Sequence, residues 1–164
     1  MSVFARRLFA SNWRPGRAAG AGLIATAVYS LAMETDKYLL GNHFHDVKFM
    51  RGLLGDTTAS KPWTELAAWM LHFLNGALLA EVYAAFCKRL LPGPNWLKGV
   101  IFGEAFVIAA WSMTPLVDRY HPMIKNGQLP RLGNWNSFWQ NLLRHFAFGI
   151  TLGLLYRERA RRIK

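Results

Sequence analysis

Two histidines, His72 and His145, are the residues whose type and spacing point most directly to chemistry. They open two similar stretches of twelve residues, HFLNGALLAEVY and HFAFGITLGLLY, that lie 73 positions apart. Each histidine stands about nine to eleven residues inside an apolar segment, or roughly 14–16 Å along a helix. If both segments cross a membrane, the two imidazoles face each other near its middle and can ligate a haem b iron or porphyrin-type pigments. The alternative is a pair of core histidines that are hydrogen-bonded to neighbouring helices.

Two acidic residues, Glu81 and Glu104, form a second candidate site. Each lies about six residues from the basic end of its apolar segment, so we expect both at a similar depth on adjacent helices. A carboxylate pair at this depth predicts a proton or cation site, as in a small ion transporter. The alternative is that the side chains extend to the membrane surface or pair with Lys88, Arg89 or Lys98.

Arg144 precedes His145 inside the same apolar segment. A guanidinium at this depth needs a carboxylate, backbone carbonyls or an anionic cofactor group as its partner. A haem propionate is one such partner, which makes Arg144 a candidate cofactor-binding residue. The structural alternative is an interhelical ion pair with Glu34, Asp36 or Glu65.

A histidine cluster outside the apolar segments suggests a metal site. His43 and His45 form an HxH pair, and His121 lies in the corresponding later connection. Imidazoles of this kind ligate zinc or copper. An HxH pair is common by chance, however, and no second pair supports it.

Signatures of common enzyme classes are absent from the sequence. There is no GxSxG elbow, no phosphate-binding glycine loop and no HExxH motif. The single cysteine, Cys87, excludes an internal disulfide and a CxxC site. We therefore expect a protein that is not an enzyme, with no catalytic residue to assign.

The composition favours a membrane domain. The chain of 164 residues is 52% hydrophobic, yet it carries 20 Lys and Arg. These basic residues gather at the ends of apolar segments instead of forming one stripe, which argues against nucleic-acid binding. A helix needs roughly 20 mostly apolar residues to cross a bilayer. Four stretches meet this need and are the predicted membrane helices, at about 17–39, 63–86, 96–117 and 136–156.

The distribution of basic residues predicts the orientation of these helices. Twelve Lys and Arg fall on the side of both termini and seven on the other side. Basic residues are enriched in cytoplasmic loops, so both termini of this multi-pass chain are expected in the cytoplasm. The tail Arg157–Lys164 is expected to bind anionic lipid head groups.

The repeat predicts how the helices pack. Two helical hairpins, 17–87 and 98–157, correspond to each other and run the same way through the membrane, so their pseudo-twofold axis lies along its normal. Small residues recur four apart in each helix and allow close backbone approach: Ala18, Gly22, Gly76, Ala80, Gly99, Gly103, Gly149 and Gly153. The predicted fold is an all-α integral membrane four-helix bundle of one domain.

Several stretches resemble a group of uncharacterised small bacterial inner-membrane proteins with four helices, distantly similar to the YagU proteins. The matching stretches are AGLIAT, DVKFMRGLLG, WMLHFLNGALLAEVYAAF, LLPGPNWLKGVIFGEAF and HFAFGITLGLLY, which together cover most of residues 18–156. The resemblance implies a four-helix fold in a bacterial inner membrane. It implies no particular activity.

The sequence therefore predicts a non-catalytic accessory or scaffold subunit of a larger membrane complex. Expected partners are membrane lipids and other membrane subunits or a second copy of the chain, not nucleic acid. A haem- or pigment-binding electron-transfer subunit is the first alternative, and a small ion or proton transporter is the second. Haem b or a porphyrin-type pigment is the only cofactor that the sequence suggests.

Overall fold

Four long helices dominate the structure, a computed structural model that describes residues 13–57 and 61–157. They are α2 (Pro15–Leu40), α4 (Pro62–Val82), α5 (Asn95–Trp111) and α8 (Trp135–Leu155). A π-helical turn, η1 (Tyr83–Cys87), extends α4. No strand occurs in the described residues, so the all-α prediction is confirmed there. The basic segment 158–164, predicted to contact lipid head groups, lies outside the described residues.

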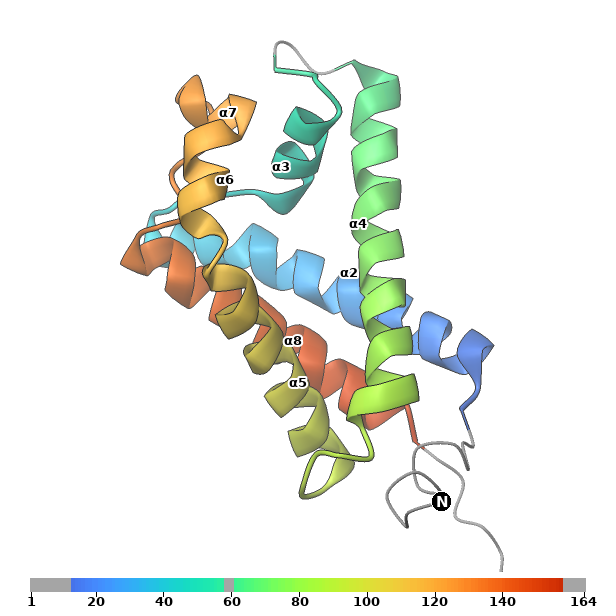
Figure 1. The fold of residues 1–164 in the computed structure, drawn as a ribbon. Helices are drawn as coiled ribbons and strands as arrows, with labels where there is room; N and C mark the ends of the chain where they lie inside the picture. The colour runs from blue at the N-terminus through green and yellow to red at the C-terminus, as the bar shows by residue number, and fades with distance from the viewer. Residues whose placement is uncertain (1–12, 58–60, 158–164) are drawn as a thin grey trace, which may run out of the picture.

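The long helices form an open row. α2 and α8 pack side by side at the centre, α4 packs against α2, and α5 packs against α8 (Figure 1). In the closed four-helix bundle that the sequence predicts, α4 and α5 would also pack along their length. Instead the two diverge, and α5 meets the α4 side mainly at η1. The short helix α3 (Asp46–Leu53) packs against α4, and Figure 1 shows it between α4 and the segment that follows α5.

Small residues bring the helices of each hairpin into backbone contact. A Cβ added to Gly22 on α2 would lie 2.7 Å from the carbonyl oxygen of Gly76 on α4. In the second hairpin, a Cβ added to Gly149 on α8 would lie 2.4 Å from the carbonyl oxygen of Gly99 on α5. The predicted small-residue positions thus sit at both helix crossings, where any side chain would push the backbones apart.

The third predicted membrane helix, 96–117, is divided in two. α5 ends at Trp111, and a second helix, α6 (Thr114–Tyr120), continues at an angle of 56°. Pro115 explains the break, because its ring would clash with the carbonyl of Trp111 in a continuous helix. The Thr114 hydroxyl donates to that freed carbonyl at 2.9 Å.

The two long connections fold against each other and cover one end of the long helices. The first contains α3, and the second contains α6 and a short helix, α7 (Pro122–Lys125). The ring of His121 stacks on Phe49 of α3 with 4.1 Å between centroids, and its Nε2–H donates to the Phe49 carbonyl at 3.0 Å. Gly52 lies against the same imidazole, because a Cβ there would come within 2.6 Å of it. The ring therefore joins the two connections.

This junction is expected to weaken in acid. Burial lowers the pKa of His121 below the imidazole's usual value of about 6.5. The unfolded chain therefore binds more protons than the folded one as the pH falls through 6.5, and stability decreases until the folded-state pKa is reached. We expect faster hydrogen exchange in α3 and α7 at pH 5.5 than at pH 7.5, after correction for intrinsic rates. His121→Phe, which keeps the stacking on Phe49 but cannot titrate, should lose this pH dependence; an unchanged dependence would contradict the assignment.

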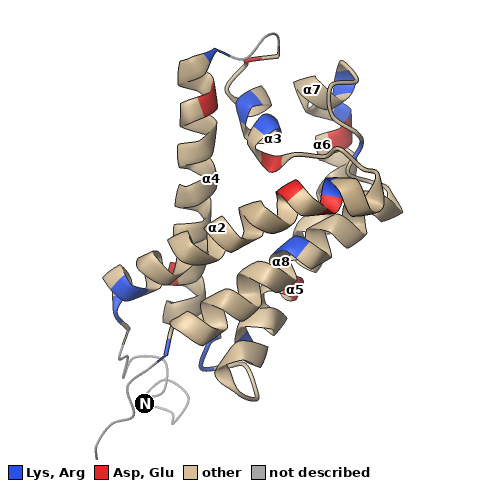
Figure 2. Ribbon diagram, turned by 180° about the vertical axis from the view of Figure 1, so that it is seen from behind, with Lys and Arg blue, Asp and Glu red and all other residues tan. Residues whose placement is uncertain are grey.

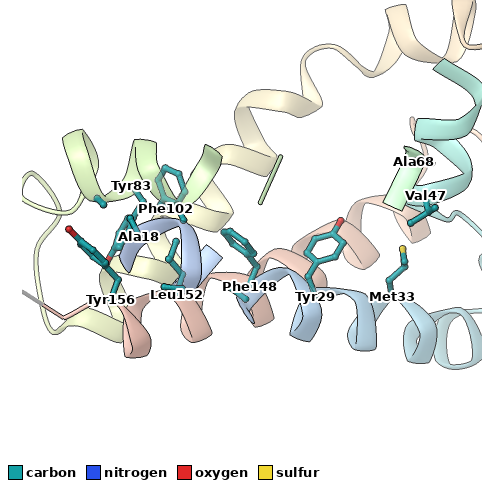
Figure 3. Packing of buried hydrophobic residues seen from close by; sticks show 14 residues of the cluster. Ala18, Tyr29, Met33, Val47, Ala68, Tyr83, Phe102, Phe148, Leu152 and Tyr156 are labelled. Atoms are coloured by element: carbon teal, nitrogen blue, oxygen red, sulfur yellow. The ribbon is translucent and has the colours of Figure 1, made fainter. Parts of the chain in front are cut away.

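The main buried cluster runs along the contact between α2 and α8 (Figure 3). Leu152 and Phe148 of α8 pack there with Ala18, Tyr29 and other residues. A second, smaller cluster lies within the connections, around Phe44 and Met123. These two clusters fix the positions of the side chains described next.

One helical segment in the described residues, Pro62–Cys87, is long and apolar enough to cross a membrane. The bent pair α5 and α6 passes the same test when taken together. Most charged residues lie toward the ends of the long helices, and the middle of α4 carries none (Figure 2). By length and composition the described helices therefore supply one or two candidate membrane crossings, whereas the sequence predicts four.

Candidate functional site

A cavity of about 230 Å³ lies in the gap between α4 and α5. α2 and α8 supply its floor, and α3 closes one end. It contains both repeat histidines. The lining consists of Thr26, Tyr29, Asp46, Phe49, Met50, His72, Asn75, Gly76, Leu79, Phe106, Val107, Ala110, Trp111, Thr114, Leu132, Asn141, His145 and Phe148.

His72 is held by a hydrogen bond that sets its tautomer. Its side chain is 6% exposed, and Nε2 lies 3.1 Å from the hydroxyl of Ser30 on α2. That hydroxyl already donates its hydrogen to the Thr26 carbonyl at 2.8 Å. His72 must therefore donate from Nε2, and its Nδ1 is left as an acceptor.

His145 is oriented in a similar way. Its Nδ1 lies 2.9 Å from the Asn141 carbonyl, which can only accept, so Nδ1 carries the hydrogen. The ring stacks on Phe106 of α5 with 5.5 Å between centroids. Nε2 is left as the second acceptor nitrogen of the cavity.

A haem between the two histidines does not fit this arrangement. Both imidazoles pack against the ring of Tyr29, at centroid distances of 5.5 Å for His72 and 5.0 Å for His145. Two axial ligands need an open slot for the macrocycle between them, and the cavity is smaller than the roughly 300–1,000 Å³ of sites for drug-sized ligands. The structure favours the alternative, histidines that are hydrogen-bonded to neighbouring groups. No step of the proposed function relies on haem.

Arg144 sits in a buried ion-pair cluster and not on a cofactor site. Its Nε and Nη2 donate to the two oxygens of Asp36 at 2.5 and 2.8 Å, and both side chains of this pair are inaccessible to solvent. Nη1 donates to Asp46 at 2.8 Å, and Nη2 also donates to the Phe44 carbonyl at 2.9 Å. These four bonds use almost all of the guanidinium's donors, which leaves little for a propionate. Of the three carboxylates that the sequence suggested as partners, Arg144 pairs with Asp36.

Neutral polar side chains complete this cluster. The Gln140 amide donates to Asp36 at 3.0 Å and to the Asn42 carbonyl at 2.7 Å. The Asn42 amide in turn donates to Ser137 at 2.8 Å and to Gln140 at 2.7 Å. Sequence reasoning missed these residues. A usable signal was the spacing of Ser137, Gln140 and Arg144, which places three polar groups on one helical face.

Tyr29 and Asp46 were also missed as site residues. The Tyr29 hydroxyl donates to Asp46 Oδ2 at 3.1 Å, the same oxygen that receives Arg144 Nη1. Tyr29 therefore links the ion-pair cluster to both cavity histidines. No local pattern marks this role, because it arises from contacts between α2, α3, α4 and α8.

The structure does not bring the two predicted acids together. Glu81 accepts from the indole of Trp13 at 2.7 Å and from the backbone N–H of Ala19 at 3.1 Å, at the start of α2. Glu104 is half-buried on α5, a helix that does not pack along α4. Within residues 13–57 and 61–157 no hydrogen bond joins them. A shared carboxylate site for ion transport is not formed by this arrangement.

The three predicted metal ligands also have separate environments. His43 is exposed, and His45 caps α3 while its Nε2 contacts Glu34 at 2.8 Å. His121 is buried in the junction with Phe49. In the part of the chain that the structure describes, no three His, Cys, Asp or Glu side chains gather in a way that could hold a metal ion. Of the HxH pair, His45 caps a helix and contacts Glu34, and His43 takes part in neither interaction.

Comparison with known proteins identifies a family but no activity. No curated protein matches the chain, and no solved structure matches it either. One family model, described as a Family of unknown function (DUF6789), matches residues 14–163. Because the match covers nearly the whole sequence, the chain belongs to this Family of unknown function (DUF6789).

Proposed function

We propose that this protein is a multi-pass helical protein of a bacterial inner membrane, which acts as a non-catalytic accessory or scaffold subunit. The observation that carries the proposal is the distribution of polarity: the helices turn large apolar side chains outward and bury a cluster of charged and polar ones. A soluble protein has the opposite arrangement, with charge outside and apolar groups inside. Lipid is the solvent in which the arrangement of this protein, with apolar groups outside and paired charges inside, is stable.

Most outward-facing side chains are apolar on all four long helices. The large ones are 36–79% exposed, as at Trp135 with 74% and Leu31 with 69%. Further examples are Ile24, Leu66, Met70, Leu74, Leu78, Ile108, Trp139 and Leu143. Such a surface is far larger than the single patches that soluble monomers expose.

The inward-facing groups account for the low hydropathy of α2 and α8. Asp36 on α2 and Arg144 on α8 lower the average apolarity of their helices, but they neutralise each other in the interior. Gln140 is likewise buried and bonded within the cluster. Charged residues that pair inside a bundle are the kind that membrane helices tolerate. The chain is therefore proposed to cross the membrane four times, whereas composition alone supports one or two membrane crossings.

The ends of the chain are proposed to face the cytoplasm. The backbone N–H of Arg14, at the start of α2, donates to the hydroxyl of Tyr156, at the end of α8, at 3.3 Å. Lys88, in the connection after α4, donates to the Tyr156 carbonyl at 2.6 Å. These three points lie at one end of the molecule, on the side to which the sequence pattern assigns twelve of the 20 Lys and Arg residues. Anionic lipid head groups are the expected partners there.

α4 supplies the proposed contact with other subunits. It packs against α2 and α3, and its remaining face is uncovered. That face carries Leu66, Met70, Leu74 and Leu78, spaced four residues apart and each more than half exposed. A straight apolar stripe of this kind suits a helix of another membrane subunit or of a second copy.

The proposal predicts that extraction of native membranes with mild detergent yields a complex larger than the monomer. The double variant Leu74→Ala/Leu78→Ala should release monomer, because it truncates two of the four large side chains on the α4 stripe. Ile108→Ala, at an equally exposed position on α5, is the matched control and should leave the complex intact. Native mass spectrometry gives the masses. A wild-type monomer, or a chain that alkaline carbonate washes from the membrane, would contradict the proposal.

A further inference from the structure

The cavity between α4 and α5 is bordered by more negative than positive charge. Arg144 is already matched by Asp36, which accepts from both Nε and Nη2. Asp46 shares the same guanidinium through Oδ2 only, so two carboxylates face one cation. Asp46 lines the cavity and is 18% exposed at its side chain, and in the described residues Oδ1 has no hydrogen bond. One negative charge is therefore left over beside a mostly apolar cavity that is partly open to the surface.

The carboxylate and imidazole atoms that remain in the cavity are acceptors. The hydroxyl hydrogens are used within the protein: Thr26 donates to Gly22, and Tyr29 donates to Asp46. The tautomers set by Ser30 and the Asn141 carbonyl leave His72 and His145 with one acceptor nitrogen each. His72 is the clearest case, because it is more than nine-tenths buried and its Nδ1 has no partner in the described residues.

The amides add to this count of acceptors. Asn141 donates one side-chain N–H to the Ser137 carbonyl at 2.8 Å, and it keeps an amide oxygen as an acceptor and a second N–H as a donor. Asn75 is exposed and can turn either amide atom toward a ligand. A ligand that satisfies the free Asp46 oxygen and the two imidazole nitrogens must bring N–H or O–H donors with it.

Aromatic rings form much of the remaining wall. Tyr29, Phe49, Phe106, Trp111 and Phe148 all border the cavity. The faces of such rings attract organic cations, and the attraction is larger where water is excluded. At about 230 Å³ the cavity has room for on the order of eight water-sized groups, since a water molecule takes about 30 Å³.

We propose that this cavity binds a small organic ammonium ion, with its N–H donors on Asp46, His72 and His145 and its carbon groups against the aromatic wall. The excess carboxylate attracts the charge, the acceptor nitrogens take the hydrogens, and the rings surround the apolar part. The inference rests on the cavity itself and does not depend on membrane insertion or on a partner subunit.

Two probes of nearly equal size and shape test this inference, phenethylammonium chloride and 2-phenylethanol. Binding to the full-length protein in detergent is measured by isothermal titration calorimetry at pH 7.5. We expect the ammonium ion to bind about tenfold or more tightly than the alcohol, because only the ion carries a charge and three donors. Tetramethylammonium, which is charged but has no N–H, should bind more weakly than phenethylammonium.

Substitutions locate the binding. Asp46→Asn should lower the affinity for phenethylammonium to that for 2-phenylethanol, whereas Glu65→Gln, which changes a carboxylate paired with Arg51 away from the cavity, should not. Ala110→Phe fills the cavity from an exposed position on α5 and should abolish binding even if Asp46→Asn fails to fold. Equal affinities for the ion and the alcohol would overturn the inference. Binding of phenethylammonium that survives Ala110→Phe would overturn it as well.

Discussion

Replacing Arg144 by methionine is expected to lower the free energy of unfolding by about 3–5 kcal/mol, the usual cost of leaving one member of a buried ion pair without its partner. Methionine fills much of the same volume, so the loss reports the charge and its hydrogen bonds. Asp36 would stay fully buried with Gln140 as its main remaining donor. The measurement is a titration with denaturing detergent, followed by circular dichroism.

Two controls separate this effect from a general loss of packing. Arg51→Met removes a buried arginine whose partner, Glu65, is 39% exposed at 3.3 Å, and we expect it to cost no more than about 1 kcal/mol. The double variant Arg144→Met/Asp36→Asn should be more stable than the sum of the two single losses implies, because the uncompensated carboxylate is gone. Strict additivity of the two substitutions would show that the pair does not act as a unit.

Gly149→Ala is expected to cost about 1–3 kcal/mol through overpacking at the crossing of α5 and α8. The new Cβ would lie 2.4 Å from the carbonyl oxygen of Gly99 and 3.0 Å from the Cα of Val100. Both contacts are with backbone, so no flexible side chain can move away, and the helices themselves must separate. We expect a lower midpoint in the same detergent titration, and Gly149→Leu should not fold.

The matched control for this prediction is Gly20→Ala on α2, where an added Cβ would meet nothing within 4 Å. Alanine there gains helix propensity, so stability should stay equal or rise by about 0.5–1 kcal/mol. If Gly149→Ala is as well tolerated as Gly20→Ala, the close approach of α5 and α8 is wrong.

The positions of the helices and of their crossings are readable from the sequence. The predicted stretch 17–39 corresponds to α2 at Pro15–Leu40, which ends at Gly41, a residue in the left-handed conformation with φ of 63°. The eight small residues of the repeat lie on helices at the spacing that close packing requires. These features are local, because period, glycine spacing and proline chemistry act within a few residues. The break at Pro115 was readable for the same reason, although the predicted helix 96–117 ran through it.

The identity of the site was decided by the tertiary structure. Arg144 bonds with Asp36, 108 positions earlier, and with Asp46 instead of Glu65. The packing of Tyr29 against both histidines, the separation of Glu81 from Glu104 and the opening between α4 and α5 likewise depend on how α3 folds back against α4. No periodicity encodes these contacts, since each joins segments that are distant along the chain. The sequence by itself determined which segments are helical and where their backbones touch; the tertiary structure alone decided which polar groups meet, because pairing across a buried interior depends on long-range geometry.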